Sequence, residues 1–565
     1  MMIKPKNILN KKTISIILIL TYLVLALNLF NLLGNQYHAG VWSFKNLYVS
    51  EQLQQNSFIS QIDFGTIADT TFYSLEGHVN NYARSKPALE YLFVVLAFFM
   101  NVTPLFLLKY PFLALINTIG LLFLYVIIKD KKQDYPLLMT IIILFLLNPI
   151  MLFLLPTASG FIFFALMFTM YIIYQLMKSK KISWSLMWFF VGILFYILVM
   201  HIYNTASYIL STYLFSTICI LILYALFSHI NKNIEIEHSI KKQLRSKNII
   251  FLGFILLAGL IILIVLGIGP FALIKYRFEI FADIIGSIKH FLTYYLSHKL
   301  LSQDISSTMS LTFVQSKTYL LSLMSFLFYS MIVYLIYLYN QFKKIKSHKM
   351  ILSNTTYIIH SYMLMLMLLF PLLTATNSLD RLPWLITFGL CIIIPTLYKE
   401  NKKYIVLFYT TIIVCALVFI PLYASSTNMY QIYDDRNINT YDTLMKLTPD
   451  ESIIWSDLKS SSYLINNNRR PMTIVSGSYQ GTNLAILVRE LYYDVPKFMS
   501  IIDDRGAEYM LITKDMTEKV FYSFNFHLKP INTNITNSMN NISYLDKIYD
   551  SGDFLYSINK ETDEI

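Results

Sequence analysis

Charged residues are scarce in this sequence: they make up 14% of its 565 residues, whereas apolar residues make up 56%. An average soluble domain carries about 25% charged residues, so the composition excludes an ordinary soluble protein and is typical of a polytopic membrane protein. The net charge of +12 lies in short Lys and Arg clusters between apolar runs. This pattern indicates membrane topology and does not indicate nucleic-acid binding.

Cysteine is also rare, and the usual signatures of soluble enzymes are missing. Cys219, Cys391 and Cys415 all lie inside apolar runs, which argues against a disulfide framework and against a zinc site. The sequence has no glycine-rich loop with P-loop spacing, no His-Glu-x-x-His and no nucleophile elbow. It therefore shows no requirement for a cofactor and leaves only a divalent metal open.

Long apolar runs, in contrast, are abundant. The first covers residues 14–33, and no small-residue cleavage site follows it, so we interpret it as a retained span and not as a signal peptide. Most of the runs are close to the roughly 20 residues that a helix needs to cross a membrane. The sequence predicts eleven spans, at 14–33, 105–128, 135–155, 159–177, 183–200, 204–228, 249–269, 317–340, 350–373, 383–397 and 404–423.

Residues 88–103, ALEYLFVVLAFFMNVT, form an apolar run that is short for a span. If this run does not cross, the Lys-rich connections all fall on the cytoplasmic side, as the positive-inside rule requires. These connections are 1–13, 129–134, 178–182, 229–248, 341–349 and 398–403. We therefore expect a re-entrant or interfacial helix at 88–103, a cytoplasmic N-terminus and an extracytoplasmic C-terminus.

Residues 424–565 have a different composition, with frequent polar and turn residues and only short apolar runs. Such runs predict strands within 452–457, 472–477, 507–513 and 553–559. Helical spacing predicts a helix over 482–493, and the Asn-rich stretch 532–542 is expected to be a loop. The predicted fold class is a polytopic α-helical membrane protein, with a membrane domain at 1–423 and an extracytoplasmic α/β domain at 424–565.

Ionisable residues that could carry chemistry gather in the outer loops 34–87 and 270–316 and in two short outer bends. Charges are costly near hydrocarbon, so those that persist there are often paired or functional. A cavity lined by both signs suits transfer from a lipid-linked phosphate, because cations bind the leaving phosphate and a carboxylate can act as a base.

Two segments resemble GT-C superfamily glycosyltransferases, such as aminoarabinose transferases and protein O-mannosyltransferases. Lys86-Pro87 before the run 89–99 is similar to the segment that closes their first outer loop, and SLDRLPWLITFGLCIIIP (378–395) is similar to a segment that opens a late span. The resemblance implies that Lys86 and Arg381 bind the phosphate of a polyprenyl-phosphate sugar donor. Arg84 and His201 are then the helpers.

The acidic residues of that family are missing from their usual places. The stretches GNQYHAG (34–40) and LPTASG (155–160) contain no acid. Asp69 and Glu76 are the best substitutes for the base because they precede Lys86 in the same loop, and Asp63 comes third. Each of these carboxylates could equally be a solvated loop residue or a helix cap.

The resemblance implies a membrane glycosyltransferase with an acceptor that is a cell-surface glycan, lipid or protein on the extracytoplasmic face. Its partners would be the lipid bilayer, the donor and this acceptor. Two alternatives are a transporter or flippase of a lipid-linked saccharide and a catalytically degenerate scaffold protein. Transporters usually carry charges within their spans, and these spans are almost free of charge.

Overall fold

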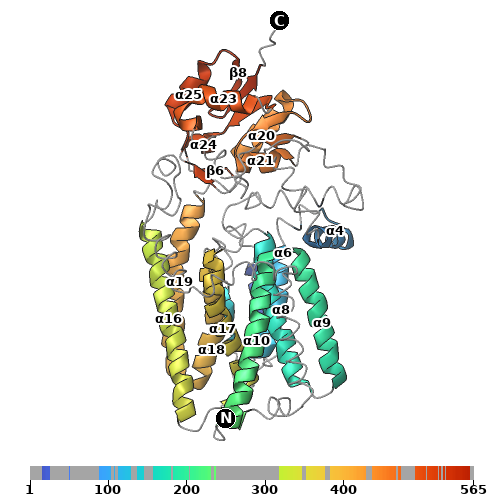
Figure 1. Ribbon diagram of the computed structural model, residues 1–565, viewed down its shortest axis with the longest axis vertical. Helices are drawn as coiled ribbons and strands as arrows, with labels where there is room; N and C mark the ends of the chain where they lie inside the picture. The colour runs from blue at the N-terminus through green and yellow to red at the C-terminus, as the bar shows by residue number, and fades with distance from the viewer. Residues whose placement is uncertain are drawn as a thin grey trace, which may run out of the picture.

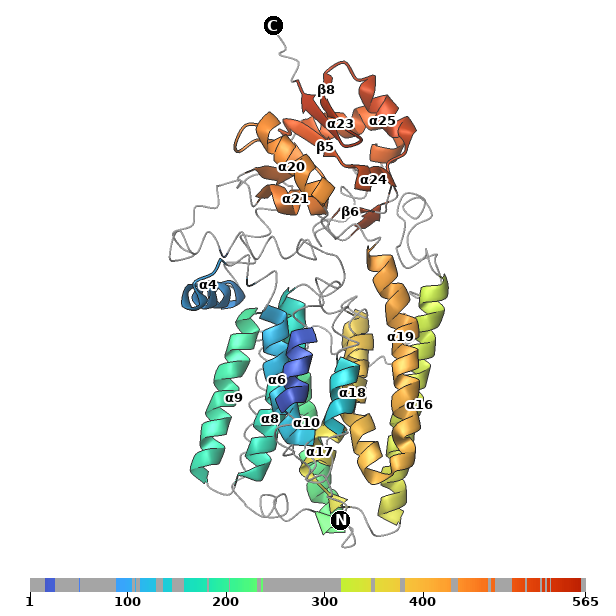
Figure 2. The same cartoon turned by 180° about the vertical axis from the view of Figure 1, so that it is seen from behind.

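The computed structural model describes the backbone of much of the chain (Figure 1). The described residues are 16–25, 50, 88–103, 107, 112–128, 136–144, 157–179, 182–202, 204–230, 235–236, 317–346, 351–375, 382–427, 435–465, 469–472, 490–503, 506–518, 521–523, 526–528 and 530–559. Long helices run side by side in a bundle, and an α/β unit lies beyond one end of that bundle (Figures 1 and 2).

The long helices coincide with predicted spans. Their bounds are Phe112–Ile128 (α6), Thr157–Lys178 (α8), Ile182–Ile202 (α9), Asn204–Ile230 (α10), Lys317–Lys346 (α16), Asn354–Ala375 (α17), Leu382–Glu400 (α18) and Ile405–Thr427 (α19). Residues 16–25 and 136–144 are helical as well, within two further predicted spans, whereas span 249–269 lies outside the described residues.

Among the described residues, two stretches pass a combined test of length and apolar composition for crossing a membrane. They are Phe161–Lys178 in α8, most of whose residues are buried, and Ser183–Met200 in α9, few of whose residues are buried. Shorter apolar helical stretches occur in 16–25, α6 and α10. The number of eleven spans stays a prediction.

Hydroxyl groups join the helices of the bundle to one another. Tyr357 of α17 donates to the carbonyl oxygen of Thr217 in α10 at 2.6 Å, and Tyr362 of α17 donates to Leu385 in α18 at 2.6 Å. Tyr329 of α16 donates to Leu407 in α19 at 2.7 Å. These bonds satisfy buried polar groups without a formal charge, which suits helices in an apolar environment.

Several helix ends meet at the end of the bundle opposite the α/β unit. Lys344 at the end of α16 pairs with Glu400 at the end of α18, and Lys399 donates to the carbonyl oxygen of Ile128, where α6 ends. A parallel pair of two-residue strands, Glu235–Ile236 (β1) and Ile351–Leu352 (β2), joins the same region. Four of the Lys-rich connections begin at these ends. The assignment of this end to the cytoplasm stays a prediction.

Helix α4 (Ala88–Met100) differs from the others in orientation. It lies across the end of the bundle nearer the α/β unit, beside α9, and not along the bundle (Figures 1 and 2). This arrangement agrees with the expectation that 88–103 does not form a full span.

The α/β unit contains a mixed five-stranded sheet. Its strands are Ile453–Trp455 (β3), Arg470–Met472 (β4), Tyr509–Ile512 (β5), Leu545–Asp550 (β8) and Phe554–Ile558 (β9). Their order is β4-β3-β5-β9-β8, with β3 parallel to β4 and β5, and with β9 antiparallel to β5 and β8. A separate hairpin pairs Phe521–Ser523 (β6) with Phe526–Leu528 (β7).

The predicted strands within 452–457, 507–513 and 553–559 are confirmed, and β4 overlaps the first residue of 472–477. The strand β8 was not predicted, because LDKIYD alternates too weakly to stand out. Of the predicted helix 482–493, only 490–493 are described, and they are helical. The division of the chain into a membrane domain at 1–423 and an extracytoplasmic domain at 424–565 stays a prediction.

The prediction of a loop at 532–542 is wrong, because Thr533–Asn540 form helix α25. The Asn532 side chain caps it by accepting from the Ile535 amide at 3.0 Å, and Ile535 and Met539, one turn apart, are buried. Burial raises the pKa of Tyr556 to about 12, and its hydroxyl donates to Asn540 Oδ1 at 3.0 Å. Burial and capping therefore outweigh the low helix propensity of an Asn-rich stretch.

The other helices of the unit are Asp435–Leu447 (α20), Leu458–Ile465 (α21), Val495–Asp503 (α23) and Lys514–Glu518 (α24). The core forms where α23 covers the sheet, and Trp455 meets Phe498 there edge to face, with ring centroids 5.1 Å apart.

Close packing in the bundle depends on Gly389 of α18. A Cβ at this position would collide with the hydroxyl of Tyr334 and lie 2.9 Å from Cε1 of Tyr362, two rings whose hydroxyls bond to carbonyls of α18. Gly389→Ala is expected to destabilise the bundle by about 1–3 kcal/mol through overpacking. Thermal unfolding of the detergent-purified protein measures this loss.

Gly192→Ala in α9 is the matched control, because its added Cβ would meet only Ile172 Cγ2 at an ordinary 3.5 Å. We expect this variant to be at least as stable as the wild type. Equal unfolding temperatures for the two variants would contradict the packing described for Gly389.

Candidate functional site

Three parallel strands of the α/β unit end at one edge of the sheet, and polar residues follow two of them. Ser456 and Asp457 follow β3, and Thr513, Lys514 and Asp515 follow β5. The chain passes from β3 to β4 on one side and later to β5 on the other. This change of direction marks the position where open α/β sheets bind ligands. We call these carboxyl ends, with the residues that contact them, the sheet-edge site.

The sheet-edge site faces the helical bundle. Helix α24 and the hairpin strand β6, which follow β5, lie on the bundle side of the α/β unit, as does α21, which follows β3 (Figures 1 and 2). Helix α20 also starts near this edge, only a few residues after α19 ends at Thr427.

A buried ion pair forms one half of the sheet-edge site. Lys459 Nζ in α21 lies 2.6 Å from Asp515 Oδ2 and 2.6 Å from Asn437 Oδ1, and both charged side chains are buried. Asn437 also donates to Asp515 Oδ2 at 3.3 Å. Because a buried charge without its partner is costly, this triangle fixes α20, α21 and α24 relative to one another.

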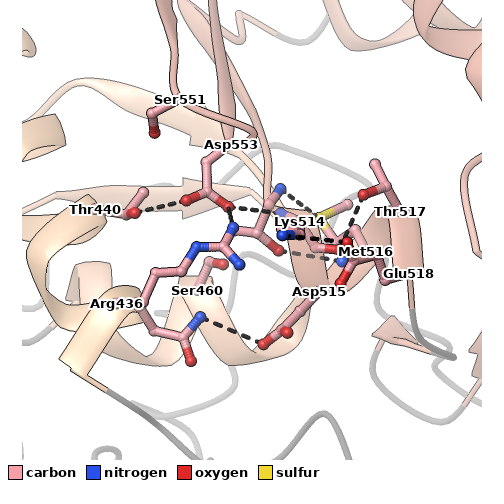
Figure 3. A network of polar contacts seen from close by, with 12 residues as sticks. Arg436, Thr440, Ser460, Lys514, Asp515, Met516, Thr517, Glu518, Ser551 and Asp553 are labelled. Atoms are coloured by element: carbon pink, nitrogen blue, oxygen red, sulfur yellow. Dashed lines mark hydrogen bonds and ion pairs between the residues drawn. The ribbon is translucent and has the colours of Figure 1, made fainter.

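Asp553 organises the other half (Figure 3). Its carboxylate accepts from Thr440 Oγ1 at 2.6 Å and from the Lys514 backbone amide at 2.6 Å, and it pairs with Arg436 Nη2 at 3.2 Å. Asp553 is buried, whereas the side chains of Arg436 and Lys514 are about half exposed. The preceding residue, Gly552, has a φ of +90°, which glycine adopts without strain.

Asp457 caps α21. Its Oδ1 accepts from the Ser460 amide at 2.8 Å, and Ser456 Oγ donates to the carbonyl oxygen of Leu511 in β5 at 3.2 Å. The carboxylates of Asp515 and Asp553 thus accept from protein donors, and Asp457 accepts through Oδ1, whereas its buried Oδ2 has no hydrogen-bond partner among the described residues. The arrangement suits a docking edge with two half-exposed cations, Arg436, which pairs with Asp553, and Lys514, which pairs with Glu518 at 3.3 Å.

No group of three or more His, Cys, Asp or Glu side chains that could hold a metal ion occurs among the residues that the structure describes. The predicted catalytic and donor-binding residues cannot be placed. Asp63, Asp69, Glu76, Arg84, Lys86 and Arg381 lie outside the described residues, and His201 lies in α9 with its side chain outside them. Whether they form one cavity therefore stays a prediction.

Three of these residues lie next to a described helix in the sequence, and the three helix ends concerned lie at the same end of the bundle. Helix α4 follows Lys86 in the sequence, α9 ends one residue after His201, and α18 begins one residue after Arg381. In Figure 1 and Figure 2, α4 and the end of α9 lie at the end nearer the α/β unit. Because α18 ends at the opposite end beside α6, its first residue lies at this end as well.

The sheet-edge site itself was missed in the sequence. Its residues are single polar side chains in different connections, with no shared spacing. The one available signal was that Ser-Asp and Thr-Lys-Asp follow two apolar strands, and their proximity depends on a strand order that the sequence did not reveal.

No protein-family model matches the sequence, and comparison with curated proteins gives no match. The fold, however, is similar to that of GT-C superfamily glycosyltransferases, as the two sequence segments predicted. One similar structure is that of the oligosaccharyltransferase AglB from the archaeon Archaeoglobus fulgidus, in complex with an inhibitory peptide and a dolichol-phosphate. Its TM-score is 0.50 at 11% identity, and the match covers 90% of this chain and 70% of that chain.

Two other structures of the A. fulgidus oligosaccharyltransferase were also found. The match to its apo form has a TM-score of 0.49 at 9% identity and covers 90% of the present chain and 70% of the oligosaccharyltransferase chain. Its complex with zinc and sulfate has a TM-score of 0.47 at 9% identity, with coverages of 88% and 68%. At these identities the likeness concerns the fold alone.

Lys459→Met is expected to destabilise the α/β unit by about 3–5 kcal/mol, because it leaves Asp515 as an unpaired buried charge. The double variant Lys459→Met, Asp515→Leu should recover most of that loss, since both charges are then removed. Pulse proteolysis of the full-length protein in urea, followed on fragments of the α/β unit, measures both variants.

Lys497→Met is the matched control for this experiment. Lys497 Nζ lies 3.0 Å from Glu490 Oε1, but the lysine is exposed, so its loss should cost no more than about 1 kcal/mol. A loss for Lys459→Met as small as that of the control would show that the buried pair does not stabilise the edge.

Proposed function

We propose that this protein is an integral-membrane glycosyltransferase. It transfers a sugar from a polyprenyl-phosphate donor to a cell-surface glycan, lipid or protein on the extracytoplasmic face. The observation that carries this proposal is that α4, the end of α9 and the start of α18 all lie at the end of the bundle that faces the sheet-edge site. The AglB structure to which the fold is similar contains an inhibitory peptide and a dolichol-phosphate. Dolichol-phosphate is a kind of polyprenyl phosphate.

In the proposed reaction, Lys86 and Arg381 bind the donor phosphate, with Arg84 and His201 as helpers. The acceptor hydroxyl attacks the anomeric carbon, and the bond between that carbon and the phosphate oxygen breaks with inversion. The leaving phosphate takes the electron pair, and the two cations stabilise its charge. Asp69, Glu76 or Asp63 accepts the proton of the hydroxyl.

The sheet-edge site would hold the acceptor in this scheme. Asp515 and Asp553 accept from protein donors and fix the geometry of this site, so we assign it binding and orientation, and we assign the proton transfer to the loop 34–87. Arg436 and Lys514 offer accessible donors for hydroxyl or anionic groups of the acceptor. No step of this scheme uses a cofactor. A divalent metal bound by carboxylates of the loop 34–87 would be compatible with it.

A scaffold protein without catalysis is the second candidate, favoured by the missing acids at 34–40 and 155–160. It would bind the donor lipid without turnover. A flippase would instead move the donor across vesicle membranes without breaking the sugar–phosphate bond.

Lys86→Ala and Arg381→Ala are each expected to lower transfer of labelled sugar by about 10²-fold or more, because each removes a cation from the leaving phosphate. The measurement uses purified protein, a labelled polyprenyl-phosphate sugar and a cell-envelope acceptor fraction. Lys178→Ala is the control, since Lys178 ends α8 at the opposite end of the bundle. Full activity of both Lys86 and Arg381 variants would refute the phosphate site.

The single variants Asp69→Asn, Glu76→Gln and Asp63→Asn identify which of the three carboxylates is the base. The variant that removes the base should lose about 10²–10⁴-fold in kcat, because the acceptor hydroxyl keeps its proton, while binding of the donor lipid is retained. Unchanged kcat in all three variants would exclude the loop 34–87 as the source of the base.

A further inference from the structure

Helix α18 has a proline in its interior, Pro395, four residues after Cys391. Proline has no backbone N–H, so the carbonyl oxygen of Cys391 cannot receive the bond that the residue four positions later normally gives in an α-helix. Cys391 and Pro395 are both buried. A buried carbonyl without a donor is costly, and helices in an apolar environment tolerate proline where a neighbouring side chain replaces the lost donor.

Thr140 supplies this donor. It is a buried residue of the helical stretch 136–144, and its Oγ1 donates to the carbonyl oxygen of Cys391 at 3.0 Å. The carbonyl oxygen of Pro136 also lies 3.0 Å from this hydroxyl, but in a helix that oxygen already accepts from the backbone amide of Thr140 itself. The hydroxyl has a single hydrogen, and the carbonyl of Cys391 is the acceptor whose intrahelical donor is missing. The bond therefore joins two helices at the position where α18 lacks a bond of its own.

The two segments of α18 on either side of this position are held differently. Beyond Pro395, Lys399 donates to a carbonyl oxygen at the end of α6, and Glu400 pairs with Lys344 of α16. The outer segment, 382–391, lies on the other side of the missing bond and begins one residue after Arg381. A change of bend at the missing bond would therefore move the outer segment relative to an anchored end.

Small changes of bend have large effects at the start of α18. A helix that lacks an internal hydrogen bond at a proline bends most easily there. Leu382 is nine residues from Cys391, or about 13 Å along the axis, so a change of roughly 10° moves the helix start by about 2 Å. Tyr362 also holds the outer segment, through the carbonyl of Leu385, but Thr140 acts at the bend itself. Displacements of about 1 Å at a reacting group already reduce enzyme rates strongly.

We propose that Thr140 is a positioning residue, whose hydroxyl replaces the donor that Pro395 lacks and thereby sets the direction of the outer segment of α18. The inference rests on the proposed function in one step, which is the assignment of Arg381 to the donor phosphate. Because Arg381 directly precedes α18, the direction of the outer segment decides where the chain delivers this cation. The effect of Thr140 on the donor lipid is transmitted through α18.

The bond itself is tested on the carbonyl carbon of Cys391. The chain has three cysteines, so carbon-13 labelling of cysteine carbonyls in the full-length protein gives three NMR signals, and Cys391→Ser identifies the one of interest. Thr140→Val should shift this signal upfield, because the carbonyl loses its hydrogen bond, and should leave those of Cys219 and Cys415 in place. In the Pro395→Ala background, where a backbone donor is restored, Thr140→Val should have little effect. An unchanged Cys391 signal in the single variant Thr140→Val would overturn the proposal.

Positioning is tested by binding of polyprenyl phosphate to the detergent-purified protein. Thr140→Val should weaken binding about tenfold, a factor typical of coupling between connected residues. Thr140→Ser keeps the hydroxyl and should bind as the wild type does. In the Arg381→Ala background, Thr140→Val should cause no further loss, because both changes then act on the same contact. Thr217→Val is the matched control, since this buried hydroxyl donates to the carbonyl of Tyr213 in its own helix at 2.8 Å.

Two binding results would overturn the proposal. One is wild-type affinity in Thr140→Val. The other is an equal loss from Thr140→Val with and without Arg381, because general damage to the bundle would then explain the effect. Absence of binding in the wild type would instead contradict the proposed function, and the carbonyl signal of Cys391 alone would then decide whether Thr140 holds α18.

Discussion

The described part of the bundle is built around one constraint, the cost of an unsatisfied polar group in an apolar environment. Hydroxyl-to-carbonyl bonds answer this constraint between α10 and α17, between α17 and α18 and between α16 and α19, and Thr140 Oγ1 likewise donates to the carbonyl oxygen of Cys391 in α18 at 3.0 Å. The buried hydroxyls of Tyr213 and Tyr337 are exceptions, because they have no hydrogen-bond partner in the described part of the chain. Formal charges occur at the ends, as in the pair of Lys344 and Glu400. Among the described residues of the long helices, the formally charged side chains thus lie at helix ends.

In the α/β unit, by contrast, formal charges are buried. Here the buried pair of Lys459 and Asp515 and the buried carboxylate of Asp553 hold the carboxyl ends of the parallel strands in place. Removing one member of such a network costs more than the network contributes as a whole, so it acts as a lock on geometry. A rigid polar edge facing a bundle whose charges lie at its ends is the arrangement that the proposed transfer between lipid donor and surface acceptor requires.

Residue patterns predicted the features that depend on local periodicity or on charge balance. Continuous apolar runs identified α8, α9, α10 and α18 to within a few residues. The Lys clusters predicted a re-entrant or interfacial helix at 88–103, and α4 lies across the end of the bundle. The GT-C resemblance was confirmed as a likeness of fold. These features have strong sequence signals because hydrocarbon tolerates few alternatives.

The features that were missed depend on contacts between distant residues. Helix α25 forms because Ile535 and Met539 are buried by the rest of the unit. The Asn-rich sequence of this stretch gives no sign of that burial. Lys459 and Asp515 are brought together by a strand order that no local pattern encodes. Likewise, the predicted donor site combines Lys86, His201 and Arg381 from three parts of the chain, so sequence alone supplies its members and not its geometry.

The most direct test of the account is a turnover measurement with the wild-type protein in sealed vesicles. A polyprenyl-phosphate donor labelled in both sugar and lipid is supplied together with acceptor on the side of the α/β unit. The account predicts that the sugar label moves to the acceptor with inverted anomeric configuration while free polyprenyl phosphate accumulates. An intact donor that binds the protein or crosses the bilayer without cleavage would contradict it.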